Sequence, residues 1–388
     1  MQQRSLEISA RLALRATVVA AAFMLALVPP GIVAAGEAGP DPHLLAAQAA
    51  LAELSLVDRA GQVLMTSVPG ATLSARDQAL LRQLRPGGII LFGANYRSRT
   101  QLTRLTRAMQ VAARAGDVAR AGAIVSIDQE GGVVRRIGDA PPTRSHPQLG
   151  AADDVDATRE QGRRTGAVLR SVGVHMDLAP VADLDLGPRR VMRERSFGSD
   201  PARVSRHVTA FVDGLQAGGA SGSVKHFPGF GGASVNSDDA LATIGRTRAQ
   251  LDLDLQPFRS AIGAGVESVM VSHGVYVRID RRRPASTSSA TYRLLRDELG
   301  YDGIAITDSL HAAGFGAATN GGVVDGCERV LVAGADIALL TGSVQEAIAC
   351  RARLVEAVRA GRLPRARLDQ AVTRVLHLKS RLGLLPAG

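Results

Sequence analysis

Apolar segments of strand length alternate with helix-like segments through most of this chain of 388 residues. Eight near-continuous apolar runs occur, at residues 61–68, 87–93, 123–129, 174–184, 222–228, 268–276, 303–310 and 336–342. Amphipathic segments lie between them, at about 75–85, 99–115, 156–172, 200–217, 253–264, 288–298 and 323–333, and two more follow at 344–360 and 364–381. Buried strands separated by helices are typical of parallel sheets, and eight such units make a closed barrel. The pattern predicts an α/β fold, a single-domain (β/α)8 TIM barrel, with an open doubly wound sheet as the competing topology.

The first 35 residues have the composition of an export signal. Arg11 and Arg15 precede an apolar run at 16–28, two prolines follow, and small residues at 33–35 offer a cleavage site. The apolar run is shorter than the roughly 20 residues that a membrane-spanning helix needs. We expect residues 1–35 to be a signal peptide, with an uncleaved N-terminal anchor as the alternative. Residues 36–50 would then be a leader and 51–388 the barrel, in a secreted or envelope-associated protein.

Composition narrows the classes of partner. The net charge is +10, which favours anionic partners such as cell-wall polymers or a membrane surface. The basic residues are dispersed and not interleaved with aromatics, so nucleic acid is not expected as a partner. Aromatic residues make up only 3% and Trp is absent. A long polysaccharide cleft needs stacking platforms, so a small pocket is expected.

Cys327 and Cys350 either pair in an oxidising compartment or are small buried hydrophobic residues.

Polar residues gather where the predicted strands end. In a barrel of this kind the functional groups lie at the carboxyl ends of the strands. Lys225 is one of only two lysines, and a Pro/Gly-rich loop with two carboxylates follows it. A tight turn leading into a solvated acidic loop is the alternative for that segment alone. The polar residues at or near the strand ends include Asp128, Glu130, Asp183, Lys225, His226, His273 and Asp308, and Met270 lies on the same strand as His273.

Six sequence motifs resemble those of glycoside hydrolase family 3, and specifically its single-domain β-N-acetylglucosaminidases of peptidoglycan turnover. The motifs are Pro-Gly-Gly-Ile-Ile-Leu-Phe at 86–92, Ile-Asp-Gln-Glu-Gly-Gly at 127–132, Ala-Pro-Val-Ala-Asp at 179–183, Arg-Ser-Phe-Gly at 195–198, Lys-His-Phe-Pro-Gly at 225–229 and Asp-Gly-Ile-Ala-Ile-Thr-Asp at 302–308. The resemblance covers roughly residues 55–345. It implies a barrel, hydrolysis of a terminal β-linked GlcNAc with retention of configuration, and no metal or other cofactor.

The same resemblance implies roles for individual residues. Asp308 matches the nucleophile, which would attack the anomeric carbon and form a glycosyl-enzyme. The residues expected to bind the sugar are Asp128, Arg136, Arg195, Lys225, His226 and Met270. His273 is expected either at the pocket wall or in the core. Glu130 is expected to be structural rather than catalytic.

The sequence departs from the family in the loop after the fifth strand. The related enzymes have Asp-Ser-His there, with the histidine as acid/base, whereas this chain has Asn236, Ser237 and Asp238. Phe230 also stands where the family usually has His. Asp238 is the first candidate for the acid/base, because most retaining glycosidases use two carboxylates. Asp239 and His311 are the alternatives.

Two other functions stay open on the sequence alone. One is β-glucosidase or β-xylosidase activity on the same scaffold, and the other is glycan binding with little hydrolysis. Water and phosphate both stay open as the acceptor, and so does the oligomeric state.

Overall fold

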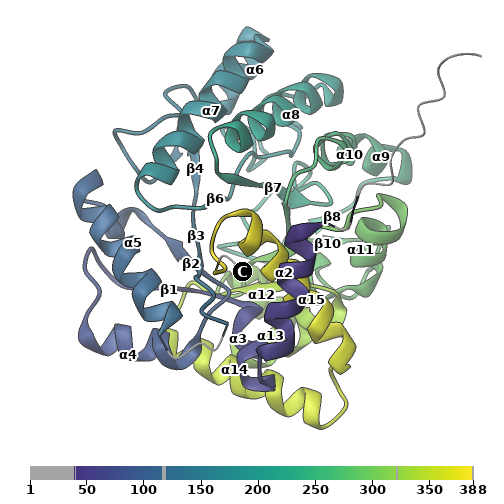
Figure 1. The fold of residues 1–388 in the computed structure, drawn as a ribbon. Helices are drawn as coiled ribbons and strands as arrows, with labels where there is room; N and C mark the ends of the chain where they lie inside the picture. The colour runs from purple at the N-terminus through teal and green to yellow at the C-terminus, as the bar shows by residue number, and fades with distance from the viewer. Residues whose placement is uncertain (1–38, 40, 116–118, 320–321, 387–388) are drawn as a thin grey trace, which may run out of the picture. The chain divides into compact units, whose positions relative to one another are not determined.

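The computed structural model describes residues 39, 41–115, 119–319 and 322–386. Eight parallel strands close into a barrel, in the order β1, β12, β11, β9, β7, β6, β3 and β2, and β2 returns to β1. The barrel strands are β1 (Leu64–Ser67), β2 (Gly88–Leu91), β3 (Ile124–Ile127), β6 (Met176–Asp177), β7 (Ser221–Phe227), β9 (Ser268–Val271), β11 (Ile304–Ser309) and β12 (Ile337–Leu339). The predicted (β/α)8 barrel is therefore confirmed, and the open-sheet alternative is wrong (Figure 1).

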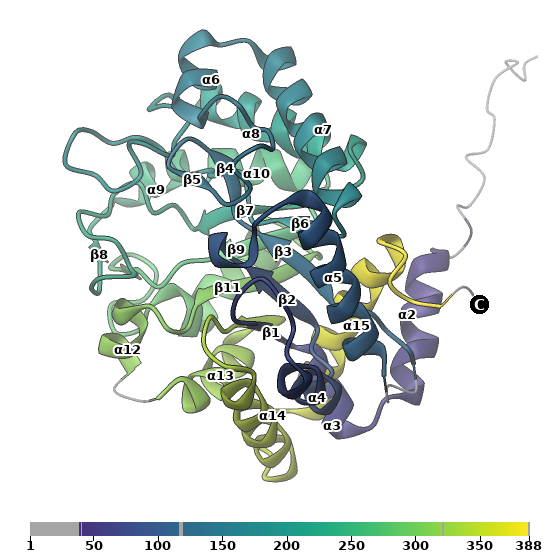
Figure 2. The ribbon, with the colours of Figure 1, turned by 90° about the vertical axis from the view of Figure 1, so that its left-hand side faces the viewer.

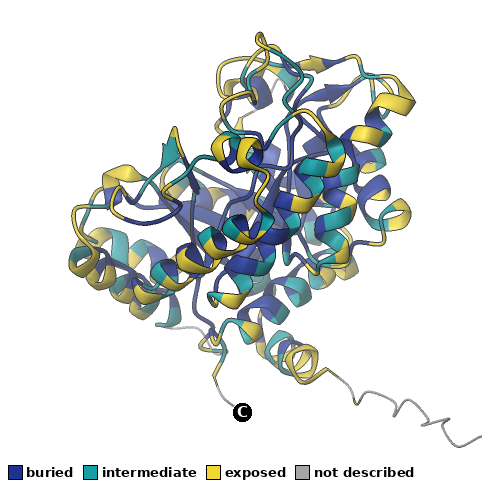
Figure 3. Ribbon diagram, turned by 90° about the horizontal axis from the view of Figure 1, so that it is seen from above, coloured by how far each residue is buried: buried dark blue, intermediate teal, exposed yellow. Residues whose placement is uncertain are grey.

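Helices surround the barrel and cover the outer faces of its strands (Figures 1 and 2). One helical segment follows each strand: α4 (Ala75–Leu84), α5 (Arg99–Arg114), α7 (Val155–Ser171), α8 (Pro201–Ala217), α10 (Gln256–Gly263), α11 (Ser289–Arg293), α13 (Val323–Ala333) and α14 (Val344–Arg359). Several begin at a Ser or Asp whose side chain accepts a first-turn N–H, which satisfies a donor that the helix itself cannot pair. Buried residues line the inner side of each helix and exposed residues the outer side (Figure 3).

Two apolar layers stabilise this arrangement. The larger layer lies between the strands and the surrounding helices. The smaller one fills the barrel itself and includes Met65, Ile90, Ile124, Met176, Leu178, Met270, Ile304, Ile306, Ile337 and Leu339. Helix α15 (Arg365–Arg381) contributes Leu378 to this inner cluster. Its neighbour Lys379 is fully buried and donates to Gln62 Oε1 at 2.5 Å.

Shorter elements decorate the barrel. They comprise helices α2 (Pro42–Glu53), α3 (Leu56–Gln62), α6 (His146–Ala152), α9 (Arg248–Asp254) and α12 (Ala313–Thr319), the single turns η1 (Gly93–Asn95), η2 (Ala285–Thr287) and η3 (Leu294–Glu298), and two small sheets formed by β4 (Gln129–Gly131) with β5 (Val134–Arg135) and by β8 (Thr243–Ile244) with β10 (Val275–Tyr276). Figure 2 shows α2 and α15 at one end of the barrel, and β8 and α12 at the other.

Most of the predicted strands extend beyond the observed ones, and three of them show the physical reason. Gly61 and Gln62, predicted in the first strand, are the last residues of α3, which begins at a reciprocal cap between Ser55 and Asp58. The fourth strand pairs only over Met176–Asp177, since Pro180 has no N–H to continue the ladder, and Val181 makes a single further bridge. The sixth ends at Val271, and the chain then joins β8 in a separate sheet.

The predicted start of the barrel domain also needs correction. Helix α2 covers Pro42–Glu53 and packs against α15, so residues 42–50, predicted as a leader, belong to the same compact unit as the barrel. Arg59 strengthens this join by donating to the carbonyls of Leu51 (3.0 Å) and Leu54 (2.9 Å). The predicted signal at 1–35 lies outside the described residues. No helix within the described ranges combines the length and apolar character needed to span a bilayer.

Cys327 and Cys350 form a disulfide that joins α13 to α14, and the distance between their Cα atoms is 5.9 Å. Both residues are fully buried. Of the two possibilities left open by the sequence, pairing is therefore the one observed.

Candidate active site

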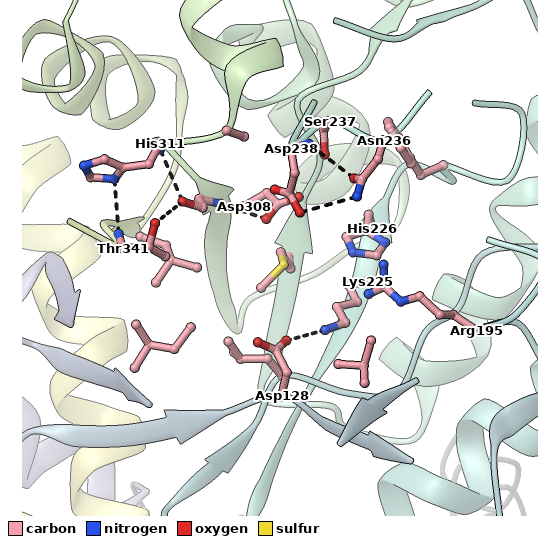
Figure 4. Close-up of a pocket in the computed structure, with 18 of the residues that line it drawn as sticks. Asp128, Arg195, Lys225, His226, Asn236, Ser237, Asp238, Asp308, His311 and Thr341 are labelled. Atoms are coloured by element: carbon pink, nitrogen blue, oxygen red, sulfur yellow. Dashed lines mark hydrogen bonds and ion pairs between the residues drawn. The ribbon is translucent and has the colours of Figure 1, made fainter. Parts of the chain in front are cut away.

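A pocket of about 540 Å³ opens at the carboxyl ends of the barrel strands. Its wall contains every residue predicted to act on or bind the sugar, together with one of the two alternative acids: Asp128, Arg136, Arg195, Lys225, His226, Asp238, Met270, Asp308 and His311. Figure 4 shows the carboxylates and cations of this group converging on one space. The structure thus brings together residues that are up to 183 positions apart in the chain, from Asp128 to His311.

One side of the pocket is a buried network of alternating charges. Lys225 Nζ lies 2.6 Å from both Asp128 Oδ1 and Glu130 Oε1. Arg195 contacts the same Glu130 with two hydrogen bonds, at 2.9 and 2.7 Å. Arg136 Nη2 is 4.0 Å from Asp128 Oδ2, and its guanidinium lies over the Phe92 ring. Charge-assisted bonds of this kind fix the side chains in place before a ligand arrives.

Glu130 is structural in this network. Its carboxylate is buried behind the pocket wall and does not line the pocket. Burial would raise the pKa of Glu130, but Arg195 and Lys225 outweigh burial and hold the pKa far below its usual value. Burial would likewise lower the pKa of Lys225, yet Asp128 and Glu130 raise it, so the ammonium persists. A compact cation between two carboxylates explains why a lysine stands here in a chain rich in arginine.

His226 is oriented by Asp183. The imidazole Nδ1 is 2.7 Å from Asp183 Oδ2, and the same carboxylate accepts the backbone N–H groups of His226 (3.2 Å) and Phe230 (2.6 Å). Asp183 is fully buried and therefore fixes both the ring and the start of the following loop. With Nδ1 bound to the carboxylate, Nε2 remains for the pocket, where His226 forms part of the wall.

Asp308 lies at the end of β11, and its Oδ1 accepts the N–H of Ser309 at 2.7 Å. Burial would raise the pKa of Asp308, but His226 and His273, the Ser309 N–H and Lys225 together lower it. The carboxylate is therefore ionised at neutral pH, which a nucleophile requires.

Asp238 faces Asp308 from the loop after β7 (Figure 4). Its backbone N–H donates to Asn236 Oδ1 at 3.2 Å, and Asn236 Nδ2 donates to Asp238 Oδ2 at 3.4 Å. Partial burial, followed by the negative charge of Asp308, raises the pKa of Asp238. The pKa values of these two neighbouring carboxyl groups are thus shifted in opposite directions. Such a pair of shifts lets one group act as nucleophile and the other as acid in the same site.

The two alternative acids are less suitably placed. Asp238 and Asp239 are both exposed, but Asp239 does not form part of the pocket wall whereas Asp238 does. His311 does line the pocket, but both ring nitrogens are occupied. Nδ1 accepts the N–H of Thr341 at 3.2 Å, so the proton lies on Nε2, which is 2.5 Å from Glu346 Oε2. His311 therefore has no nitrogen left for a glycosidic oxygen in this conformation.

His273 does not line the pocket, so of its two expected positions the core is the one observed. It is fully buried, with Nδ1 2.7 Å from Ser286 Oγ and Nε2 2.8 Å from the carbonyl oxygen of Ser309. Phe92 and Thr341 also line the pocket without having been predicted, although they follow β2 and β12 and the same strand-end rule points to them. Met192 lines the pocket too, and it lies in an irregular segment without a periodic signal.

Within the ranges that the structure describes, no group of three or more His, Cys, Asp or Glu side chains is arranged to hold a metal ion.

Comparison with known proteins shows the family of the chain and agrees with its fold. Residues 55–378 match the model of the glycosyl hydrolase family 3 N-terminal domain. The chain is 33% identical over 288 residues to a beta-hexosaminidase of Nitrosospira multiformis, covering 72% of this chain and 80% of that protein. It is 35% identical over 339 residues to the beta-hexosaminidase LpqI of Mycobacterium tuberculosis, covering 84% and 83% respectively.

A similar solved structure is a glycoside hydrolase family 3 beta-N-acetylglucosaminidase from Paenibacillus sp. str. FPU-7. It matches with a TM-score of 0.81 and 35% identity over 86% of this chain, and this chain spans 64% of that structure. The family model covers most of the barrel and all of the pocket residues. The chain belongs to glycosyl hydrolase family 3.

Proposed function

We propose that this chain is an exported, retaining exo-β-N-acetylglucosaminidase, which hydrolyses terminal β-linked GlcNAc from muropeptide- or chitin-derived saccharides. The observation that carries the proposal is the pair of facing carboxylates, Asp308 with a lowered pKa and Asp238 with a raised one. The names of the relatives, beta-hexosaminidase and beta-N-acetylglucosaminidase, support the choice of sugar.

The proposed reaction has two steps. Asp308 attacks the anomeric carbon while Asp238 gives its proton to the departing oxygen, which leaves a glycosyl-enzyme and an ionised Asp238. Asp238 then takes a proton from a water molecule, and the oxygen of that water displaces Asp308. Two inversions restore the β configuration. Asp128, Lys225, Arg195 and His226 would hold the sugar hydroxyls during both steps, because their own contacts already fix their positions.

The pocket supports an exo mode of action. Buried charged residues form its wall on one side, and its volume of about 540 Å³ suits a small ligand. Cation and carboxylate groups there match the hydroxyls of one terminal sugar. Export is proposed from the signal-like sequence at 1–35, and the disulfide between Cys327 and Cys350 supports an oxidising compartment.

The first test is a panel of aryl β-glycosides that carry GlcNAc, glucose or xylose. The proposal expects turnover of the GlcNAc compound to exceed that of the others, and NMR of the first product to show the β-anomer. Preference for glucose or xylose would favour the alternative activity, initial α-anomer would exclude the two-step scheme, and sugar binding without turnover would favour a glycan-binding protein.

The second test assigns the two carboxylates. Asp308→Ala should lower kcat by several orders of magnitude, and a fluorinated slow substrate should label Asp308 covalently. Asp238→Ala should impair poor leaving groups far more than activated ones, because activated groups depart without a proton. Azide should partly rescue Asp238→Ala by attacking the glycosyl-enzyme without a base. Asp239→Ala is the matched control and should behave as wild type; equal behaviour of the two variants would remove Asp238 from the role.

A further inference from the structure

The segment that carries Asp238 rests on the helix that follows Asp308. In the 236–240 loop, the carbonyl of Ser237 accepts the N–H of Gly314 at 2.9 Å, and the carbonyl of Asp238 accepts the N–H of Ala313 at 3.2 Å. Ala313 and Gly314 are the first two residues of α12. First-turn N–H groups of a helix have no acceptor within the helix. The loop therefore supplies acceptors for the first two N–H groups of α12, and these hydrogen bonds hold the loop at two successive carbonyls.

Gly314 allows this close approach. A Cβ added at Gly314 would lie 2.6 Å from the carbonyl oxygen of Ala240 and 2.9 Å from that of Ser237. Both are backbone atoms, so the contact could be relieved only by moving the loop or the helix. The φ angle of Gly314 is not in the left-handed region, so the residue is needed for space and not for an unusual backbone conformation.

The helix is itself tied to the nucleophile. The carbonyl of Ser309, next to Asp308, accepts both His273 Nε2 (2.8 Å) and the N–H of Ala312 (3.0 Å). The ring of Phe315 in α12 packs on that of the fully buried His273, with 4.8 Å between their centroids. Asp308, the start of α12 and the 236–240 loop are thus joined by continuous short contacts. Moving the loop away from Asp308 while α12 stays in place breaks the hydrogen bonds at Ala313 and Gly314.

We propose that Gly314 is a positioning residue that sets the reach of Asp238 toward the glycosidic oxygen. The proposal rests on the acid/base role proposed above for Asp238. Added bulk at position 314 pushes the loop away from α12, and Asp308 stays in place because β11 holds it. The defect then falls on proton transfer and not on nucleophilic attack.

The test compares two glycines of the same helix. Gly314→Ala should lower kcat/KM for an alkyl β-N-acetylglucosaminide about 10- to 100-fold, and for the 2,4-dinitrophenyl compound by less than about 3-fold. Gly316→Ala is the matched control, because a Cβ there would meet no atom within 4 Å. It should leave both rates unchanged. Equal rates in the two alanine variants, or an equal loss on both substrates in Gly314→Ala, would overturn the proposal.

A double-mutant cycle separates positioning from general damage. If Gly314 acts through Asp238, then adding Gly314→Ala to Asp238→Ala should cause no further loss on the alkyl substrate. Ala313→Pro provides a second route should Gly314→Ala fold poorly. It removes the N–H that Asp238 accepts, and proline is tolerated at the first position of a helix. The same selective loss on the alkyl substrate is expected, and wild-type rates in Ala313→Pro would overturn the proposal.

The cycle also tells this proposal apart from the one on which it rests. Should Asp238→Ala show no dependence on the leaving group, the acid/base role fails. Should it show that dependence while Gly314→Ala matches Gly316→Ala, the acid/base role stands and only the positioning role fails.

Discussion

At the scale of single residues, surroundings rather than residue type separate the two facing carboxylates. Asp308 and Asp238 have the same side chain. At Asp308, burial raises the pKa, but nearby cationic and N–H groups lower it by more. At Asp238, burial and the negative charge of Asp308 both raise the pKa. Replacing the usual histidine with Asp238 thus leaves a group with a raised pKa at the place where the proposed reaction needs a proton.

The pH dependence of activity follows from these directions. The reaction needs Asp308 ionised and Asp238 protonated. Because the pKa of Asp308 is lowered, activity should persist at pH values below the usual pKa of an aspartate. Because the pKa of Asp238 is raised, activity should be lost only as the pH rises through a value above the usual pKa of an aspartate. We expect a bell-shaped profile of kcat/KM with an acidic optimum, measured between about pH 3 and pH 8. With an activated substrate, Asp238→Asn should remove the descending limb, and its persistence would contradict this assignment.

At the scale of elements, short contacts between neighbouring segments decide where side chains point. The ladder of β11 ends at Ser309, whose carbonyl is held by His273, and α12 begins four residues later. The disulfide joins α13 and α14 on the outside of the barrel, and neither cysteine lines the pocket. Stability and catalysis are therefore expected to respond separately to changes there.

Removing the disulfide should destabilise the fold and spare turnover. The two cysteines are 23 positions apart, and a loop of that size corresponds to roughly 3 kcal/mol of unfolding free energy in the chain-entropy description. Changing both Cys327 and Cys350 to Ala should lower the free energy of unfolding by about that amount in urea titrations, with kcat unchanged. As a control, a reductant should destabilise the wild type during unfolding and leave the double variant unaffected. A matching loss of kcat in the folded variant would contradict the separation.

At the scale of the whole molecule, the barrel has a polar end that holds the pocket and another end closed by α15. Leu378 of α15 reaches the apolar cluster inside the barrel, and α2 packs on the same helix. His43 of α2 contacts Ser380 of α15 at 3.0 Å between Nδ1 and Oγ. Figure 2 shows these helices at the end away from α12 and β8.

Helix α2 should therefore contribute to stability alone. We compare a chain that begins at Pro42 with one that begins at Leu54. The shorter chain loses the helix that covers α15, including the buried Ala47 and the carbonyl of Leu51 that Arg59 contacts. Its thermal midpoint should be lower by several degrees, while kcat and KM on an aryl substrate stay the same below that temperature. Equal midpoints would show that α2 adds nothing to the barrel.

The alternation of apolar runs and amphipathic segments determined the barrel, because eight buried parallel strands can bury their faces in few ways. The strand-end rule, with the family motifs, then placed Asp128, Lys225, His226 and Asp308 at one end. Strand lengths were overestimated where local chemistry competes with apolar character, as at the cap of Ser55 and at Pro180.

Only the tertiary structure decided which of several plausible acids is suitably placed. The sequence ranks Asp238 first, because it stands where the related enzymes have histidine, and it leaves Asp239 and His311 as alternatives. In space, Asp238 faces Asp308, Asp239 is outside the pocket wall, and His311 has both nitrogens engaged by Thr341 and Glu346. The physical reason is that burial and hydrogen-bond partners come from segments distant in the chain. The packing of the 236–240 loop against Gly314 likewise depends on segments distant in the chain, since the carbonyls next to Gly314 belong to Ser237 and Ala240.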